Sequence, residues 1–189
     1  MNYHPEESRY SRRGRVLYSS FDTDIGQFLV ASTWRGVVHL LLPTEPRDHF
    51  FSWLYKLFGA ENVLAQPPGS SGSGPSAHND LAADEIRKYL TLELKAFSVP
   101  LDLRGSEFQL AVWERVRQIP HGSTASYSEI ARAIGRPKAV RAVGAANRAN
   151  PIPIIIPCHR VIGSNGSLVG YGGGLELKRY LLDLERAVH

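Results

Sequence analysis

Hydrophobic and polar positions change their spacing several times along the chain, and each change predicts a different element. Two β-rich runs over residues 26–31 and 36–42, separated by a short polar stretch, are typical of a β-hairpin. Over residues 48–59 the large apolar side chains recur at helical spacing and end at a glycine. A second helical pattern occupies residues 81–90. The first hundred residues therefore predict a sheet combined with helices.

Composition divides the chain into segments of different character. Residues 1–15 contain four arginines and little apolar content, so we expect a loosely held tail. Residues 67–79 are rich in Pro, Gly and Ser and cannot bury enough apolar surface to hold one conformation, which predicts a flexible surface loop. A domain boundary is expected between residues 1–104 and residues 105–189.

The second half is predicted to be mostly helical. Apolar residues over 108–119 recur on one helix face. Ser126 and Glu129 form a capping-box pattern, which marks the start of a short helix that ends at Gly135. Pro137 suits the first turn of the next helix, because its missing amide would be unpaired there in any case. Two short helices around a tight turn indicate a helix-turn-helix motif, although many helical bundles contain such turns.

The second of these short helices has two different faces. Val140 and Val143 are expected to point one way, whereas arginines and small residues occupy the other face. Small residues allow close approach of another backbone, which favours phosphate contact and minor-groove insertion over the reading of base edges. The alternative is that Ala and Gly simply pack against another helix. The candidate DNA contacts are Lys138, Arg141, Ala142, Gly144, Ala145 and Arg148.

Cys158 is the only cysteine in the chain. A single thiol forms no internal disulfide and no zinc site built from several thiolates. It follows the apolar run 152–156, whose β-branched part 154–156 predicts a short buried extended segment, and it precedes His159 and Arg160. Because nearby His or Arg can lower the pKa of a thiol from about 8.5, these neighbours favour a nucleophile. The alternative is a buried cysteine that acts as a small apolar residue.

Two features follow the cysteine. Asn165-Gly166 predicts a tight turn, and the glycine-rich stretch 171–174 predicts a loop that a ligand can approach closely. A last helix is expected to place Leu177 and Leu181 on its core face, with Glu185 near its end.

Charge is unevenly distributed along the chain. The net charge is +4, but residues 105–189 hold 11 Lys and Arg against 6 Asp and Glu, whereas the remainder holds 11 against 12. The excess suggests a polyanionic partner for the second half. No stretch approaches the roughly 20 apolar residues that span a bilayer, and the start lacks a secretory pattern. We therefore expect a soluble intracellular protein without membrane contact.

Several motifs in order carry a specific resemblance. The segment 156–162 reads IPCHRVI and is preceded by RAVG at 141–144 and by Asn150-Pro151, and the matching stretch runs over about 101–185. The chain resembles the methylated-DNA--protein-cysteine methyltransferases, also called O6-alkylguanine-DNA alkyltransferases. The resemblance implies an α+β fold. A small α/β, ribonuclease H-like amino-terminal domain would precede a mostly helical domain with a winged helix-turn-helix-like motif.

The resemblance also implies roles for individual residues. Cys158 would accept the alkyl group by attacking the sp3 carbon on guanine O6, and His159 would act as its base through a water molecule. Glu185 would orient the imidazole, by the logic of a hydrolase triad. Asn150 would tie the recognition helix to the cysteine segment. Tyr127 would donate a hydrogen bond as negative charge develops on the leaving base.

The target atom lies inside the duplex, so the base must rotate out of the stack. Arg141 is expected to fill the vacated space. Many relatives carry a larger residue in place of Gly172, which predicts a roomier pocket for bulky adducts. The thioether product resists hydrolysis, so each molecule acts once, on O6-alkylguanine and O4-alkylthymine in double-stranded DNA, without cofactor or metal. The residues expected to bind the flipped base are Tyr127, Pro153, Val161, Tyr171 and Gly172.

Three other functions share part of this pattern. A zinc deaminase would need a second thiol, and a cysteine hydrolase would not need the helix that carries Arg141. A DNA-binding protein without chemistry, either a lesion-binding relative or a regulator, is the strongest alternative, and Cys158 argues against it. The resemblance further implies a monomer in a prokaryotic cytoplasm, and it leaves open cooperative assembly along DNA.

Overall fold

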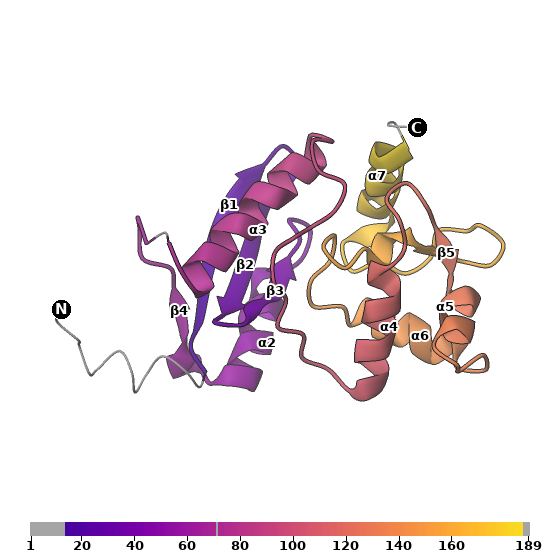
Figure 1. Ribbon diagram of the computed structural model, residues 1–189, viewed down its shortest axis with the longest axis horizontal. Helices are drawn as coiled ribbons and strands as arrows, with labels where there is room; N and C mark the ends of the chain where they lie inside the picture. The colour runs from indigo at the N-terminus through magenta and orange to yellow at the C-terminus, as the bar shows by residue number, and fades with distance from the viewer. Residues whose placement is uncertain (1–13, 71, 187–189) are drawn as a thin grey trace.

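Two lobes make up the structure, a computed structural model that describes residues 14–70 and 72–186 (Figure 1). The first lobe contains a four-stranded sheet in the order β3-β2-β1-β4. Strands β1 to β3 are antiparallel neighbours, and β4 lies parallel to β1, so the predicted hairpin is confirmed. The strands are β1 (Val16–Thr23), β2 (Gly26–Thr33), β3 (Gly36–Leu41) and β4 (Val63–Ala65).

Helices cover both faces of this sheet. Helix α3 (Pro75–Leu90) packs on one face and α2 (Arg47–Phe58) on the other, and the 3-10 turn η1 (Ala60–Asn62) leads into β4. Along β2, Phe28 belongs to the buried cluster of α3, whereas the next residue, Leu29, belongs to the cluster of α2. Because successive strand residues point to opposite faces, a strand covered on both sides needs apolar residues at successive positions.

Helix α3 begins earlier than the apolar spacing indicates. Pro75 occupies its first turn, where a missing amide costs no hydrogen bond. The loop expected over residues 67–79 therefore overlaps the start of the helix, where Asn79 is fully buried. Ser71 and most of the tail expected over residues 1–15 lie outside the described residues.

Four helices and a two-stranded parallel sheet form the second lobe. The capping box is present, since the Ser126 amide donates to the Glu129 carboxylate at 2.6 Å and the Glu129 amide donates to the Ser126 hydroxyl at 3.2 Å. The two short helices of the expected helix-turn-helix motif are therefore α5 and α6. The elements are α4 (Glu107–Arg117), β5 (Ala125–Ser126), α5 (Tyr127–Ala133), α6 (Val140–Arg148), η2 (Cys158–Arg160), β6 (Val161–Ile162) and α7 (Gly174–Arg186).

Two local predictions in this lobe are wrong. Pro137 lies in the turn before α6, which begins three residues later. The apolar run 152–156 is not extended but folds into a tight turn, in which the Ile156 amide donates to the Ile152 carbonyl and Ile154 has a φ of 71°. A β-branched residue rarely adopts this left-handed conformation. The turn is fully buried, so its surroundings hold a conformation that local preference disfavours.

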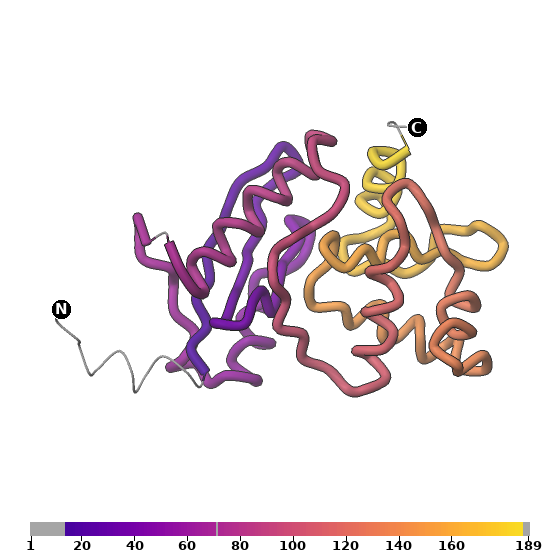
Figure 2. Tube along the Cα trace, viewed as in Figure 1, coloured from indigo at the N-terminus to yellow at the C-terminus, as the bar shows by residue number. Residues whose placement is uncertain are grey.

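The two lobes share one hydrophobic core. Leu40 of β3 and Ile152 of the second lobe belong to the same buried cluster, and the Leu40 amide donates to the Pro151 carbonyl at 2.9 Å. Figure 2 shows the segment 91–106 passing from the end of α3 to the start of α4. Its backbone bonds to Val37 and so covers the edge strand β3.

The expected α+β architecture is confirmed, while its ribonuclease H-like topology and the exact domain boundary stay predictions. Within residues 14–70 and 72–186, no helix combines the length and the apolar character that crossing a membrane requires.

Candidate active site

Cys158 begins the turn η2, directly after the tight turn of residues 152–156, and is only 4% exposed. The Asn150 side chain donates to its Sγ at 3.0 Å and to the Ile156 carbonyl at 2.9 Å. Asn147, in the last turn of α6, donates to the Cys158 carbonyl at 3.3 Å. One amide side chain in the last turn of α6 and one just after its end therefore bond to the segment that carries the thiol.

The thiol of Cys158 is neutral at rest. Burial raises its pKa to about 11, although the hydrogen bond from Asn150 and the positive charge of Lys178 both act to lower it. This is opposite to the lowering expected from His159 and Arg160 in the sequence. In the structure both of those side chains point to Glu185, and no hydrogen bond joins His159 to the thiol among the described residues. A base is therefore needed to generate the thiolate.

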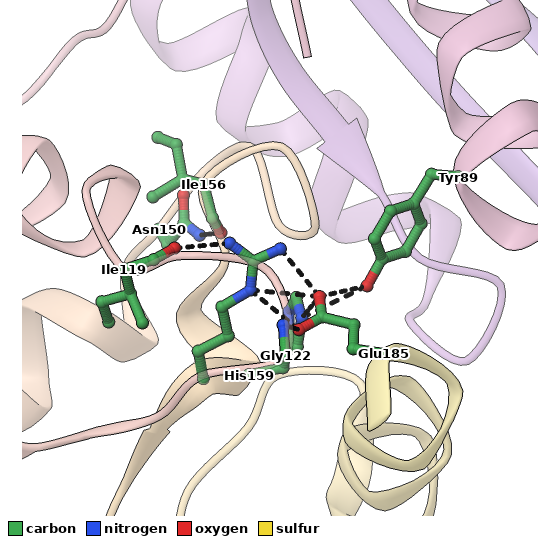
Figure 3. Close-up of polar contacts among 8 residues, drawn as sticks. Tyr89, Ile119, Gly122, Asn150, Ile156, His159 and Glu185 are labelled. Carbon is green, nitrogen blue, oxygen red and sulfur yellow. Dashed lines mark hydrogen bonds and ion pairs between the residues drawn. The ribbon is translucent and has the colours of Figure 1, made fainter. Parts of the chain in front are cut away.

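Glu185, near the end of α7, lies at the centre of a buried polar cluster, on which Tyr89 and His159 converge (Figure 3). Its carboxylate accepts from the Tyr89 hydroxyl at 2.7 Å and from His159 Nε2 at 2.9 Å. The Gly122 amide donates to its second oxygen at 3.0 Å. Arg160 adds a forked contact, with Nε at 3.0 Å and Nη2 at 2.8 Å from Oε1. Glu185 thus fixes the imidazole through a network that also includes the first lobe.

The contacts of Glu185 determine which nitrogen of His159 can act as a base. Burial by itself would raise the pKa of Glu185, but hydrogen bonds from His159 and Arg160 and the positive charge of Arg160 outweigh it and hold that pKa well below its usual range. An ionised carboxylate only accepts, so His159 Nε2 carries the hydrogen and Nδ1 keeps its lone pair. Burial lowers the pKa of His159, which keeps the ring neutral. Nδ1 is buried and has no hydrogen-bond partner among the described residues.

The sequence did not single out Tyr89 or Lys178, and it assigned Arg160 to the thiol, whereas the structure joins Arg160 to Glu185. Lys178 shares the buried face of α7 with Glu185, seven residues away, so helical spacing could have predicted that both side chains are buried together. Its Nζ donates to the carbonyl oxygens of Val161 at 2.6 Å and Val169 at 2.8 Å, and burial lowers its pKa to about 8. Tyr89 lies on α3, 96 residues before Glu185, and no local pattern indicates that contact.

The second short helix presents the expected surface. The side chains of Arg141, Ala142, Ala145 and Arg148 are exposed, whereas Val143 is fully buried. Val140 differs from the prediction because it is 37% exposed. Small residues and arginines therefore form one open face of α6, and the turn before the helix adds exposed Lys138.

The residues assigned to base binding differ in burial and in hydrogen-bond partners. Pro153 and Val161 are buried, and the Val161 carbonyl already accepts from Lys178. The Tyr127 hydroxyl donates to the Val169 carbonyl at 3.1 Å. Tyr171 has a buried hydroxyl without a hydrogen-bond partner in the described part of the chain.

The space beside Gly172 is not empty. A Cβ placed on this glycine would lie 2.8 Å from Oε1 of Glu45, which belongs to the first lobe. The roomier pocket expected from the missing side chain is therefore partly filled by a carboxylate from the other lobe.

Comparison with known proteins places this chain in a family. A family profile described as "6-O-methylguanine DNA methyltransferase, DNA binding domain" matches residues 107–187. The inducible methylated-DNA--protein-cysteine methyltransferase of Bacillus subtilis (strain 168) is 47% identical over 159 residues, which cover 84% of each chain. The chain belongs to the methylated-DNA--protein-cysteine methyltransferase family.

Further matches extend over both lobes of the methyltransferase. The constitutive enzyme of the same bacterium is 37% identical over 170 residues, covering 89% of this chain and 94% of the relative. A crystal structure of Mycobacterium tuberculosis OGT in complex with DNA superposes with a TM-score of 0.73 at 41% identity, covering 90% of this chain and 93% of that one. The methyltransferase is therefore a DNA-repair enzyme by family, with the fold of its structural relatives.

Proposed function

We propose that Cys158 accepts one alkyl group from O6 of guanine in DNA and is consumed by the reaction. A single observation carries the assignment. The family transfers a methyl group to a protein cysteine, and this chain contains only one cysteine. The neighbouring contacts supply the chemistry, because Asn150 holds the sulfur and the unpartnered Nδ1 of His159 is a base held by Glu185.

The proton and the electrons balance in a direct displacement. His159 Nδ1 removes the proton from Cys158 through one water molecule, and the sulfur electron pair forms a bond to the alkyl carbon. The bond between that carbon and O6 breaks, and its electrons stay on the purine. The purine anion takes up one proton from Tyr127 to give neutral guanine, and the proton that His159 took from Cys158 returns through water to Tyr127. The thioether has no leaving group that this site activates, so one protein molecule acts once.

The open face of α6 supplies the contact with double-stranded DNA. Lys138 and Arg148 neutralise phosphates, while the small residues at 142, 144 and 145 let the helix approach the minor groove. Arg141 fills the stack once the alkylated base has rotated toward Cys158, at a cost of a few kcal/mol. O4-alkylthymine presents the same alkyl-oxygen bond and is proposed as a second substrate. We further propose that the protein is a cytoplasmic monomer before it binds DNA.

The test uses duplex DNA with one O6-methylguanine whose methyl group is isotopically labelled. After incubation with the intact protein, peptide mass analysis is expected to place one labelled methyl group on the peptide that contains Cys158, with one guanine repaired per protein molecule. The matched control is Cys158→Ser, which should bind the duplex but acquire no label. Label on another residue, or several guanines repaired per molecule, would overturn the assignment.

A further inference from the structure

The first lobe reaches the glycine-rich loop of the second lobe through residues 42–45, which follow β3. The Thr44 hydroxyl donates to the Gly173 carbonyl at 3.0 Å. Glu45 approaches the neighbouring glycine of the same loop, because its Oε1 lies 2.8 Å from the position of a Cβ on Gly172. A segment distant in sequence therefore forms one wall beside this loop.

The Glu45 carboxylate is anchored in this position. Its Oε2 accepts from the Leu42 amide at 3.1 Å, and the side chain is half-buried. With Oε2 bonded to the backbone, Oε1 faces Gly172, where there is no side chain to shield it. Burial raises the pKa of Glu45, whereas the Leu42 amide and the charge of His49 act to lower it. The ionised carboxylate presents a negative charge at a defined point beside Gly172.

The field of Glu45 extends to the groups around the thiol. Burial is the main cause of the raised pKa of Cys158 and of Tyr171, and the charge of Glu45 raises both further. Lys178 acts in the opposite direction on Cys158. Glu45 therefore acts electrostatically on the place where the alkyl carbon and the sulfur would meet.

We propose that Glu45 is a specificity-determining residue, which discriminates against O6 adducts that carry a negative charge next to the transferred carbon. The inference rests on the proposed function, because it takes the space between Cys158 and Gly172 as the site of the adduct. Two unit charges a few ångströms apart interact several times more strongly in a partly buried site than in water. A neutral adduct of the same shape meets no such repulsion.

Two substrates of nearly equal size distinguish the effect of adduct charge on the transfer rate from the effect of adduct shape. One duplex carries O6-carboxymethylguanine, which is anionic, and the other carries O6-carbamoylmethylguanine, which is neutral. The single-turnover transfer rate is measured for both with the wild-type protein and with Glu45→Gln, whose side-chain oxygen can still accept from Leu42. The ratio of the anionic to the neutral rate is expected to rise about tenfold in the variant, which corresponds to about 1.4 kcal/mol.

The control is Asp48→Asn, which changes the net charge equally but alters an exposed side chain in the first turn of α2. Its rate ratio should equal that of the wild type. An unchanged ratio in Glu45→Gln, or an equal rise in Asp48→Asn, would overturn the proposal. The rate on the neutral duplex reports folding separately, because misfolding would slow both substrates together, whereas removal of the charge alone should leave this rate at its wild-type value.

The same series separates this proposal from the proposed function. O6-methylguanine duplex is included as the reference substrate for the wild-type protein. If no methyl reaches Cys158 from it, the function itself fails. If methyl transfer proceeds but the anionic-to-neutral ratio does not respond to residue 45, only the role of Glu45 fails.

Discussion

Glu185 and Cys158 are both buried in the second lobe, yet the structure stabilises a negative charge on Glu185 and opposes one on Cys158. Glu185 has a pKa well below its usual range. Cys158 has one side-chain donor, Asn150, and its pKa is raised to about 11. Burial alone therefore does not decide a charge state, and the number of donors aimed at the group does. The donors to Glu185 are Tyr89, Gly122, His159 and Arg160.

This difference in charge state suits a cysteine that reacts only once. A permanent thiolate at Cys158 would react with any small electrophile that reached it. A buried neutral thiol reacts only when a base removes its proton and an alkyl carbon is correctly placed. The permanent charge at Glu185 holds His159 in the tautomer that can act as that base. Removing a donor from Glu185 should mainly change the stability of the fold, whereas removing the donor of Cys158 should change the pH dependence of its reactivity.

The largest effect is expected from removing the forked donor of Glu185. Arg160→Met leaves a buried carboxylate without its strongest partner, which should lower the free energy of unfolding by about 3 kcal/mol. Urea denaturation of the wild type and the variant measures it. The matched control is Arg186→Met on the same lobe, where the side chain is exposed and 3.9 Å from Asp183, and the change should be below about 0.5 kcal/mol. Equal losses in both variants would contradict the role of Arg160.

A smaller effect concerns the pH dependence of the thiol. Because the pKa of Cys158 is raised from about 9 to about 11, its thiolate fraction near pH 8 should be about a hundredfold below that of an ordinary cysteine. The rate of alkylation by iodoacetamide should rise tenfold per pH unit up to about pH 10 without a plateau. The same protein unfolded in urea should reach half of its maximal rate near pH 9 and level off above about pH 10. A plateau near pH 7 in the folded protein would show that the thiol is activated at rest.

A variant of Asn150 tests which contact sets the pH dependence of Cys158. Its hydrogen bond lowers the pKa of Cys158, so Asn150→Ala should move the alkylation profile to still higher pH. Asn165→Ala, in an exposed turn of the same lobe, should leave the profile unchanged. If both variants shift it alike, the bond to the sulfur is not the cause.

The smallest effect should come from Tyr89→Phe. Loss of one hydroxyl donor to Glu185 is expected to cost about 1 kcal/mol of unfolding free energy, because three other residues still donate to the carboxylate. Differential scanning calorimetry against Tyr55→Phe, whose side chain is 44% exposed, provides the comparison. A change no larger than in that control would place the hydroxyl outside the network.

Features that depend on residues close in sequence were predictable. The capping box of Ser126 and Glu129 spans three residues, and the exposed face of α6 follows from helical spacing alone. The turn of residues 152–156 was mispredicted because a β-branched run favours an extended strand locally, while packing imposes the left-handed conformation of Ile154. Tertiary packing outweighs local preference where a segment is fully buried.

The sequence by itself determined the candidate nucleophile Cys158 and the arginine-bearing helix, because each rests on residue type and short spacing, and its resemblance to a family indicated the α+β class. Only the tertiary structure decided the charge states, since these depend on donors brought together from distant segments. Tyr89 and Glu185 lie 96 residues apart, and Glu45 meets Gly172 from the other lobe. Hydrogen bonds and buried charges act over a few ångströms of space and not along the chain. The sequence thus indicated a reactive sulfur, and the fold determined that it rests as a protonated thiol.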